Sequence, residues 1–417
     1  MTQDNAQFTW RVGSRPPVIE SHSNAKLSLL EGYLDRYFDI VCATPQMERF
    51  RITLVDAFCG GGLFTHQGED RLGSPLVMID AVRRAEERLN RRRGKPLTID
   101  AQFVFVDRSA SAIEHLRHAL DRTGLGEWAS GRIHIRNTTA SSAIPELVEA
   151  ARKWTPRTGR SIFLFDQCGY SDVRNHDVRV LYHELPKSEV IVTYAFGAIY
   201  DYMTESSEFL AGTAPIELQA EELRDLLKSK EHVRVGRYFA GRLLGQHLQN
   251  RVGSQYASRF FLRSERSGRD MWLVHYSKVR RSRLAMNDAH WSVQNSITQG
   301  DAGLDMVGFV PRWEDDISFD FGFKESDAER MQAALMSEFP HLLERFDIDD
   351  APTFDTLLSS VANGAAATED QIQRALNSLH GANDVEILTP SGANMRPNSL
   401  ILPTHRIRLA RQRKLIL

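Results

Sequence analysis

The stretch that decides the fold is LVDAFCGGGLF, residues 54–64. Apolar residues lead to one carboxylate, Asp56, and the chain then passes through Cys59 and three consecutive glycines. An apolar, β-rich run of this kind predicts a strand that is covered on both faces. Glycine tolerates a positive φ and lets a ligand approach the backbone closely. We therefore predict a buried strand that ends in an acid and opens into a turn with exposed backbone N–H groups.

Strand and helix patterns alternate five times along the first half of the chain. Such alternation predicts parallel strands joined by crossover helices, the doubly wound, Rossmann-like α/β sheet. Ligands bind such sheets at the carboxyl ends of the strands, and three of the predicted strands end in an acid there: Asp56, Asp107 and Asp166. The strand segments that we predict are 51–58, 101–107, 131–137, 161–170 and 188–196.

Predicted helices surround these strands. Asn24 is a suitable N-cap for a helix over 26–41, which places one apolar face on Leu27, Leu30, Tyr33, Leu34, Tyr37 and Phe38. Ser74 and Pro75 form a start signal for the helix after the glycine turn. Two amphipathic helices follow within a helical insertion at about 204–252, and segments 255–263 and 271–277 predict a hairpin that closes the sheet with an antiparallel pair.

The remainder predicts a second module. Segments 325–339, 353–363 and 368–383 read as helices, and 385–390 and 399–404 read as strands. This order is typical of a winged helix. We expect an N-terminal arm at 1–22, a domain that carries the Rossmann-like sheet at 23–295, a linker and helix at 296–350, in which 313–323 is acidic and irregular, and a winged-helix-like domain at 351–417 that ends in a basic tail.

Composition limits the functional classes. The 417 residues are 42% hydrophobic and 25% charged, with a net charge of −2, so no overall field attracts nucleic acid or membranes. The three cysteines, Cys42, Cys59 and Cys168, form no pair, and we expect neither a disulfide framework nor a metal site. The polar N-terminus lacks the apolar core of a signal peptide, and no apolar run reaches the ~18 residues of a membrane span. We expect a cytoplasmic protein.

The acids and glycines favour S-adenosylmethionine over a dinucleotide as the cofactor. In a GxGxxG pattern begun at Gly60 and Gly62, the third glycine would stand at position 65, which is Thr65. A nicotinamide-dependent oxidoreductase is therefore a weak alternative. Asp56 suits a cationic group, and Asp107 stands where an acid accepts both ribose hydroxyls. S-adenosylmethionine carries an ammonium, a sulfonium and a ribose, and no phosphate.

The segment FLFDQCGY, residues 163–170, is the candidate reaction centre. Amino-directed methyltransferases carry Asp or Asn, two prolines and an aromatic at this place. Asp166 and Tyr170 fit the two ends and are our candidate catalytic residues, but Gln167 and Cys168 replace the prolines. We predict that Cys168 is a buried structural thiol rather than a nucleophile, because no histidine is near it in sequence. The predicted cofactor-binding residues are Asp56, Phe58, Cys59, Gly60, Gly62, Asp107, Arg108, Asp166 and Gln167.

On the motifs VDAFCGGG, LGSPL and FLFDQCG, together with the Met286, Ala289 and Trp291 pattern, the chain resembles the three-Cys-motif partner proteins, within the class I methyltransferase-like superfamily. The resemblance covers most of the chain up to about residue 295. It implies a Rossmann-like methyltransferase domain and a radical-SAM-type partner protein. The family has Phe-Ala-Gly-x-Gly at the glycine turn and Asp-Pro-aromatic-Gly at the reaction centre, and this chain departs more from the second motif than from the first.

Four segments concentrate arginine and lysine: 82–95, 259–269, 278–283 and 405–414. With a winged helix they favour nucleic acid as a partner, because contacts from arginine and lysine to phosphate supply most non-specific affinity. Winged helices also contact proteins, and basic runs are often the solvated face of a helix. Our leading hypothesis is an S-adenosylmethionine-dependent methyltransferase acting on nucleic acid or a nucleic-acid-associated target. The alternative is a catalytically silent scaffold that partners another enzyme or recognises foreign DNA.

Overall fold

The computed structural model describes residues 8–230, 236–263, 270–292, 304, 325–347 and 349–410. The chain divides into two compact units, unit 1 at 1–293 and unit 2 at 294–417. The helix that we assigned to a linker, α12, lies within unit 2 and packs against α14. The acidic segment 313–323 lies outside the described residues.

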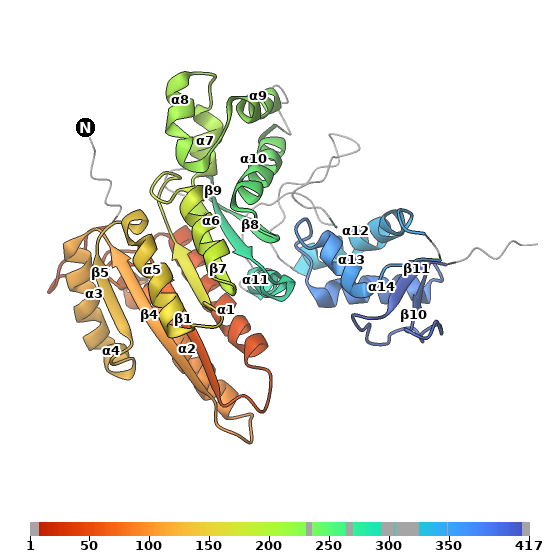
Figure 1. Cartoon of the computed structure of the whole chain (residues 1–417), viewed down its shortest axis with the longest axis horizontal. Helices are drawn as coiled ribbons and strands as arrows, with labels where there is room; N and C mark the ends of the chain where they lie inside the picture. The colour runs from red at the N-terminus through yellow and green to blue at the C-terminus, as the bar shows by residue number, and fades with distance from the viewer. Residues whose placement is uncertain are drawn as a thin grey trace, which may run out of the picture. The chain divides into compact units, whose positions relative to one another are not determined.

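Unit 1 is built on a seven-stranded sheet (Figure 1). The spatial order is β5-β4-β1-β6-β7-β9-β8; the pairs among β5, β4, β1, β6 and β7 are parallel, and β9 runs antiparallel to both of its neighbours. Five parallel strands closed by an antiparallel strand inserted next to the last are the Rossmann-like class I methyltransferase fold, as predicted. The strands are β1 (Arg49–Asp56), β4 (Thr98–Asp107), β5 (Ile133–Asn137), β6 (Ser161–Phe165), β7 (Ser188–Tyr194), β8 (Tyr256–Arg263) and β9 (Asp270–Ser277).

Helices cover both faces of this sheet (Figure 1). One face is covered by α1, α2, α3 and α11, and the other by α5 and α6. The six residues predicted to form the apolar face of the first helix are all buried. The bounds are α1 (Ser21–Val41), α2 (Ser74–Asn90), α3 (Ala110–Thr123), α4 (Leu125–Trp128), α5 (Ala140–Trp154), α6 (Asn175–Glu184) and α11 (Arg280–Ser292).

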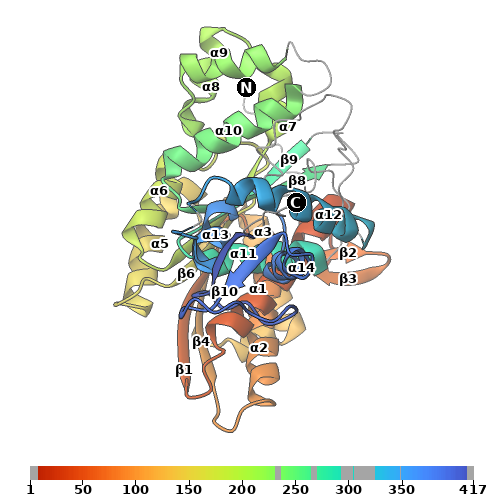
Figure 2. The same ribbon diagram turned by 90° about the vertical axis from the view of Figure 1, so that its right-hand side faces the viewer.

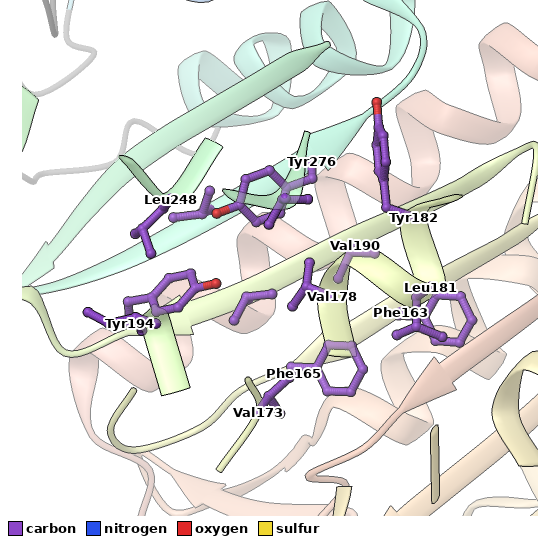
Figure 3. Packing of buried hydrophobic residues seen from close by; sticks show 14 of the residues in the cluster. Phe163, Phe165, Val173, Val178, Leu181, Tyr182, Val190, Tyr194, Leu248 and Tyr276 are labelled. Carbon is purple, nitrogen blue, oxygen red and sulfur yellow. The ribbon is translucent and has the colours of Figure 1, made fainter. Parts of the chain in front are cut away.

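A buried cluster under α5 and α6 joins the sheet to the helical insertion (Figure 3). Phe163 and Phe165 of β6 are fully buried there and stack with their ring centroids 6.3 Å apart. Tyr194 of β7 and Tyr276 of β9 bring their hydroxyl groups into the same cluster, beside Leu248 of the insertion. Burying such aromatic side chains supplies much of the free energy of folding. The strands that end in the acids are therefore held by a well-packed core.

The insertion follows the carboxyl end of β7 and stands at the top of the view in Figures 1 and 2. Its two longest helices are those predicted from the sequence, and two further short helices precede them. The elements are α7 (Phe196–Tyr202), α8 (Ser207–Gly212), the 3-10 turn η1 (Ala214–Ile216), α9 (Ala220–Ser229) and α10 (Gly236–Val252).

Three local predictions in unit 1 are wrong. Asn24 is not an N-cap, because α1 begins at Ser21 and the Asn24 side chain accepts a hydrogen bond from Arg71. Gly73 takes the N-cap position of α2 instead of Ser74. The glycine turn does not lead directly to α2, since a hairpin of β2 (Leu63–His66) and β3 (Glu69–Leu72) intervenes.

Unit 2 contains α12 (Glu325–Leu343), α13 (Phe354–Val361), α14 (Glu369–Gly381), β10 (Val385–Leu388) and β11 (Arg406–Leu409). The two strands pair antiparallel. The strand predicted at 399–404 is wrong, because this segment packs along α14: Asn377 donates to the carbonyl of Ser399 and Gln373 accepts from the amide of Ile401. The strand that pairs with β10 comes a few residues later. The winged-helix assignment stays a prediction.

Candidate functional site

The glycine turn and Asp107 meet at the carboxyl edge of the sheet. The amide of Gly60 donates to Oδ2 of Asp107 over 2.9 Å, and the amide of Ser109 donates to Oδ1 over 2.8 Å. Gly60 has φ +55° and Gly62 has φ +78°, a backbone region that other residues rarely adopt. These two parts of the predicted site therefore lie side by side. A carboxylate has about four lone-pair directions, so Asp107 keeps the capacity to accept hydrogen bonds from a ligand.

Asp56 is fully buried below the turn. Its Oδ1 accepts from the amide of Phe58 over 3.1 Å, while Oδ2 has no hydrogen-bond partner within the described part of the chain. Burial, with smaller contributions from the charges of Asp166 and Asp107, raises the pKa of Asp56 to about 7, although hydrogen bonds from Ser74 and Phe58 lower it. The three acids predicted from the sequence are thus close enough to influence one another. Near neutral pH, Asp56 holds a proton part of the time.

Asp166 lies just beyond β6 and is bound by two side chains. Nζ of Lys26 lies 2.5 Å from Oδ1 and 2.6 Å from Oδ2, and the Thr193 hydroxyl donates to Oδ1 over 2.8 Å. The Lys26 side chain is 11% exposed and that of Asp166 is 32% exposed. Lys26 comes from α1 and Thr193 from β7. The arrangement holds the Asp166 carboxylate, at the candidate reaction centre, against a lysine and leaves part of the carboxylate exposed.

The other residues of the segment 166–170 differ in role. Gln167 is buried, and its Oε1 accepts from the amides of Asp172 and Val173 over 3.1 Å each, so it shapes the loop that follows Asp166. Desolvation, then the charge of Asp166, raises the pKa of the Cys168 thiol and so opposes a role as a nucleophile, but the residue is exposed, so the prediction of a buried thiol is wrong. Tyr170 is half-buried against the core cluster, and burial raises its pKa.

Phe58, Cys59 and Arg108 surround the junction of the turn and Asp107. Phe58 packs on the core cluster, and the Cys59 amide donates to the carbonyl of Val106 over 3.1 Å. Burial raises the pKa of the Cys59 thiol well above its usual range. Arg108 is exposed beside Asp107. Its charge partly offsets the rise in the pKa of Cys168, so Arg108 lies near the segment after β6.

The space left by the missing side chains of the glycine turn is already filled. A Cβ atom at Gly61 would lie 2.2 Å from Cδ1 and Cγ of Trp10, and one at Gly60 would lie 2.8 Å from Cη2 of the same indole. A Cβ at Gly62 would lie 2.7 Å from Cδ1 of Leu116. The sequence pattern led us to expect room for a ligand on these glycines. The structure shows instead that their side-chain directions face protein, and a ligand at the turn has to lie beside Trp10.

A small apolar cavity lies next to the Lys26–Asp166 pair. Its walls come from α1, the start of α2, strands β6, β7 and β9, and α11. Lys26, Ser74 and Asp166 supply its polar groups, and the apolar lining consists of Leu27, Leu29, Leu30, Leu164, Ile191, Leu273 and Met286.

Most basic residues of segment 82–95 bind other parts of the protein. Arg88 contacts Asp35 and Asp39 of α1, and Arg84 contacts Glu31. Arg93 donates to backbone carbonyls of the loop that precedes β1. In segment 278–283, Lys278 donates to the carbonyl of Leu185, whereas Arg281 is exposed. Arg84 and Arg88 hold α2 against α1, so their charges are not available to bind phosphate.

Lys26, Thr193 and Trp10 were missed by sequence reasoning. Lys26 interrupts the predicted apolar face of its helix, since positions 26, 30, 33 and 37 share one side, and this was a usable signal. Thr193 and Trp10 had none, because their partners are distant in sequence. None of the helices in the described part of the chain is long and apolar enough to span a bilayer.

No protein-family model matches the chain, and no curated protein has a significantly similar sequence. The likeness to three-Cys-motif partner proteins therefore stays a prediction. Solved structures with a similar fold include a DUF519 protein from Legionella pneumophila, with 8% identity, TM-score 0.35 and coverage of 62% of this chain and 86% of that chain.

A plantazolicin methyltransferase, solved with a desmethyl plantazolicin analogue and SAH, has 15% identity, TM-score 0.25 and coverage of 61% and 86% of the two chains. A putative O-methyltransferase from Klebsiella pneumoniae has 13% identity, TM-score 0.29 and coverage of 59% and 80%. All three TM-scores are low, so the fold rests on the strand order described above and not on these likenesses.

Proposed function

We propose that this protein is an S-adenosylmethionine-dependent methyltransferase. The observation that carries the proposal is the position of two acids at the same edge of the sheet: Asp107, joined to the glycine turn through Gly60, and Asp166, held by Lys26, lie at the ends of β4 and β6, the two strands that flank β1. In open α/β sheets this edge is where ligands bind. Asp107 would accept the ribose hydroxyls, and Asp56 would face the positively charged end of the cofactor.

The remaining residues would complete the cofactor site. Gly60 and Gly62 give the turn its left-handed backbone, and Phe58 and Cys59 place it on the core. Arg108 would border the adenosine side, next to Asp107. Gln167 would act through the loop that it shapes, and Tyr170 would flank the target group. In this proposal, some of the site residues predicted from the sequence would contact the ligand and the others would position them.

The reaction centre suits a nitrogen or oxygen nucleophile. The cofactor supplies the methyl group; the nucleophile's lone pair forms the new bond to carbon while the carbon–sulfur bond breaks toward sulfur. Asp166 would accept the hydrogen bond of the attacking N–H or O–H group and receive or pass on its proton. Lys26 and Thr193 orient the carboxylate.

Nucleic acid, or a nucleic-acid-associated molecule, is our proposed target, and the exposed basic residues of unit 1 would bind it. The described residues of unit 2 are acidic overall: 325–347 and 349–410 contain 13 Asp and Glu against 6 Arg and Lys, a difference of −7. A protein partner, including one of radical-SAM type, would fit that unit at least as well. Binding of nucleic acid would then depend on unit 1.

A silent scaffold is the second candidate, and two observations favour it. Lys26 contacts both oxygens of Asp166, and the Trp10 indole covers Gly60 and Gly61. A lysine already binds the Asp166 carboxylate and an indole already covers the glycine turn. Such a site is compatible with a protein that no longer binds a cofactor. This candidate predicts no cofactor binding and a stable complex with another protein.

Calorimetric titration with S-adenosylhomocysteine separates the two candidates. We expect the wild type to bind it and Asp107→Ala to bind at least about tenfold more weakly, because the acid that would hold the ribose is removed. A labelled-methyl assay over DNA, RNA and protein pools then identifies the target class. A wild type that binds no S-adenosylhomocysteine and transfers no methyl group, yet co-purifies with a partner, would leave only the scaffold.

A further inference from the structure

The N-terminal arm, residues 8–20, is held along the β2–β3 hairpin. The Thr65 amide donates to the carbonyl of Pro17 over 2.8 Å, and the Ile19 amide donates to the carbonyl of Thr65 over 3.0 Å. Arg15 donates to the carbonyl of Gly68 over 3.0 Å. Backbone pairing of this kind fixes the path of the arm, so the arm is an ordered part of the glycine-turn region.

Trp10 is the arm residue that reaches the glycine turn. Its Nε1 donates to the carbonyl of Leu63 over 2.9 Å. The ring of Phe64 meets the indole edge-on with centroids 5.5 Å apart, and Phe8 packs at 5.7 Å. The indole then lies over Gly60 and Gly61 so closely that neither position has room for a Cβ atom. A hydrogen bond and two aromatic contacts thus determine the orientation of the ring.

We propose that Trp10 is a cofactor-binding residue whose indole forms the outer wall of the site and packs against the amino-acid end of S-adenosylmethionine. The inference rests on the proposed function. The position of Gly60 supports this role: its amide donates to Asp107, while a Cβ atom at this residue would point toward Trp10. A ligand held by Asp107 at this turn therefore lies next to the indole. The ammonium and sulfonium groups are cations of the kind that the face of an indole attracts.

The arm does not replace the ligand. The hydrogen bonds that Trp10 and Ile19 donate go to carbonyls of the β2–β3 hairpin and not to the acids Asp56, Asp107 and Asp166. Its Arg15 pairs with a backbone carbonyl of the hairpin instead. A segment that had taken the place of a cationic ligand would offer a cation to these carboxylates, because buried carboxylates without partners are costly. Asp56 and Asp107 keep their capacity for a ligand while the indole covers the glycines.

Titration of the full chain with S-adenosylhomocysteine tests the proposal. We expect Trp10→Ala to bind about tenfold more weakly than the wild type and Trp10→Phe to lie between them, since an aromatic contact is lost or reduced. Val12→Ala, an exposed change on the same arm, should bind like the wild type. Tryptophan emission should change on binding in the wild type, and this change should be largely absent in Trp10→Phe, which also serves if Trp10→Ala does not fold.

Gly61→Ala gives an independent test. The new Cβ would collide with the indole, so we expect this variant to bind as weakly as Trp10→Ala, and the double variant to be no weaker than either. Additive losses would overturn the proposal, because Gly61 would then contact the ligand without Trp10. Unchanged or tighter binding by Trp10→Ala, while the wild type binds, would overturn this inference alone. A wild type that does not bind would remove the proposed function together with it.

Discussion

Nζ of Lys26 lies within 2.6 Å of both carboxylate oxygens of Asp166, although 140 residues separate the two in sequence. The lysine side chain is almost fully covered. When one partner of such a pair is removed, the other is left as an uncompensated charge with reduced access to water. The pair therefore links helix α1 to the carboxyl end of β6, and the proposed chemistry depends on it.

Replacing Lys26 with methionine should reduce the rate of methyl transfer by about 10²-fold or more while S-adenosylhomocysteine binding changes little. The reason is that Lys26 orients the acid of the reaction centre and does not contact Asp107. The rate is measured with labelled methyl groups on the pool that the wild type modifies, and binding by calorimetry. Lys228→Met, which removes a surface lysine paired with Asp225, is the control. Equal loss of rate and binding would contradict the assigned role.

The buried Asp56 should make stability depend on pH. Its pKa is about 7 in the folded protein against an ordinary value of 3.8, so the folded state retains a proton that the unfolded state releases. This contribution is complete below pH 4 and is lost as the pH rises through about 7. From pH 5 to pH 8, the free energy of unfolding of the wild type should fall by about 2 to 3 kcal/mol relative to Asp56→Asn.

Urea denaturation of the two proteins at several pH values measures this difference. Asparagine keeps a polar group of similar size and has no proton to lose in this range. If the two free energies change in parallel with pH, Asp56 is already ionised in the folded protein, and its place beside a cationic ligand needs another explanation.

Gly62→Ala should destabilise the protein by about 1–3 kcal/mol. Gly62 has φ +78°, and a Cβ would press on Leu116 of α3, so both the backbone and the packing oppose the change. Gly94→Ala is the matched control because nothing lies within 4 Å of its added Cβ and its φ is not positive. Thermal or urea unfolding compares the two. Similar small effects would show that the turn relaxes easily.

The strand order and the three acids could be predicted from the sequence because both depend on local patterns. Continuous apolar strands and amphipathic helices alternate, and each acid ends its strand or directly follows it. The crossover rules then bring Asp56, Asp107 and Asp166 to one edge. The β2–β3 hairpin had a sequence signal that was not used, namely Gly68. In the structure, Gln67 and Gly68 form a two-residue turn and both adopt positive φ.

The rest of the site could not be predicted because it depends on contacts between distant segments. Gly60 and Gly61 suggested an open ligand surface, yet their missing side chains make room for Trp10, which lies some 50 residues earlier. Basic runs such as the one that contains Arg88 suggested phosphate binding, yet acids on α1 occupy it. Glycine and arginine serve ligands and protein interiors alike, and only the tertiary structure separates these uses.

If nucleic acid binds to unit 1, Arg88→Gln should reduce stability without changing binding, and Arg281→Gln should weaken binding. Arg88 connects α2 to two acids of α1, so its loss should lower the free energy of unfolding by about 1 kcal/mol and leave binding unchanged. Arg281 is exposed, so its loss should weaken binding and reduce the salt dependence by about one ion. Fluorescence anisotropy with labelled DNA and RNA at several salt concentrations measures this. Equal losses in both variants would contradict the assignment.

A buried polar network fixes the helix that carries Lys26. Glu189 of β7 accepts hydrogen bonds from Tyr33 of α1, and from Ser282 of α11 over 2.7 Å, and it lies 2.9 Å from Nε2 of His275 in β9. Tyr33 follows Lys26 by two helical turns on the same face. Removing the hydroxyl with Tyr33→Phe should lower the free energy of unfolding by about 1–2 kcal/mol, because a buried acceptor loses a donor.

The methyl-transfer rate of Tyr33→Phe should fall as well, and by less than that of Lys26→Met, since the helix is loosened while the lysine remains. Urea denaturation and the labelled-methyl assay measure the two effects. Tyr202→Phe, at a tyrosine that is 65% exposed, should change neither. A Tyr33→Phe variant with reduced stability and a full rate would show that the network supports the fold alone and that Lys26 is positioned by its contact with Asp166.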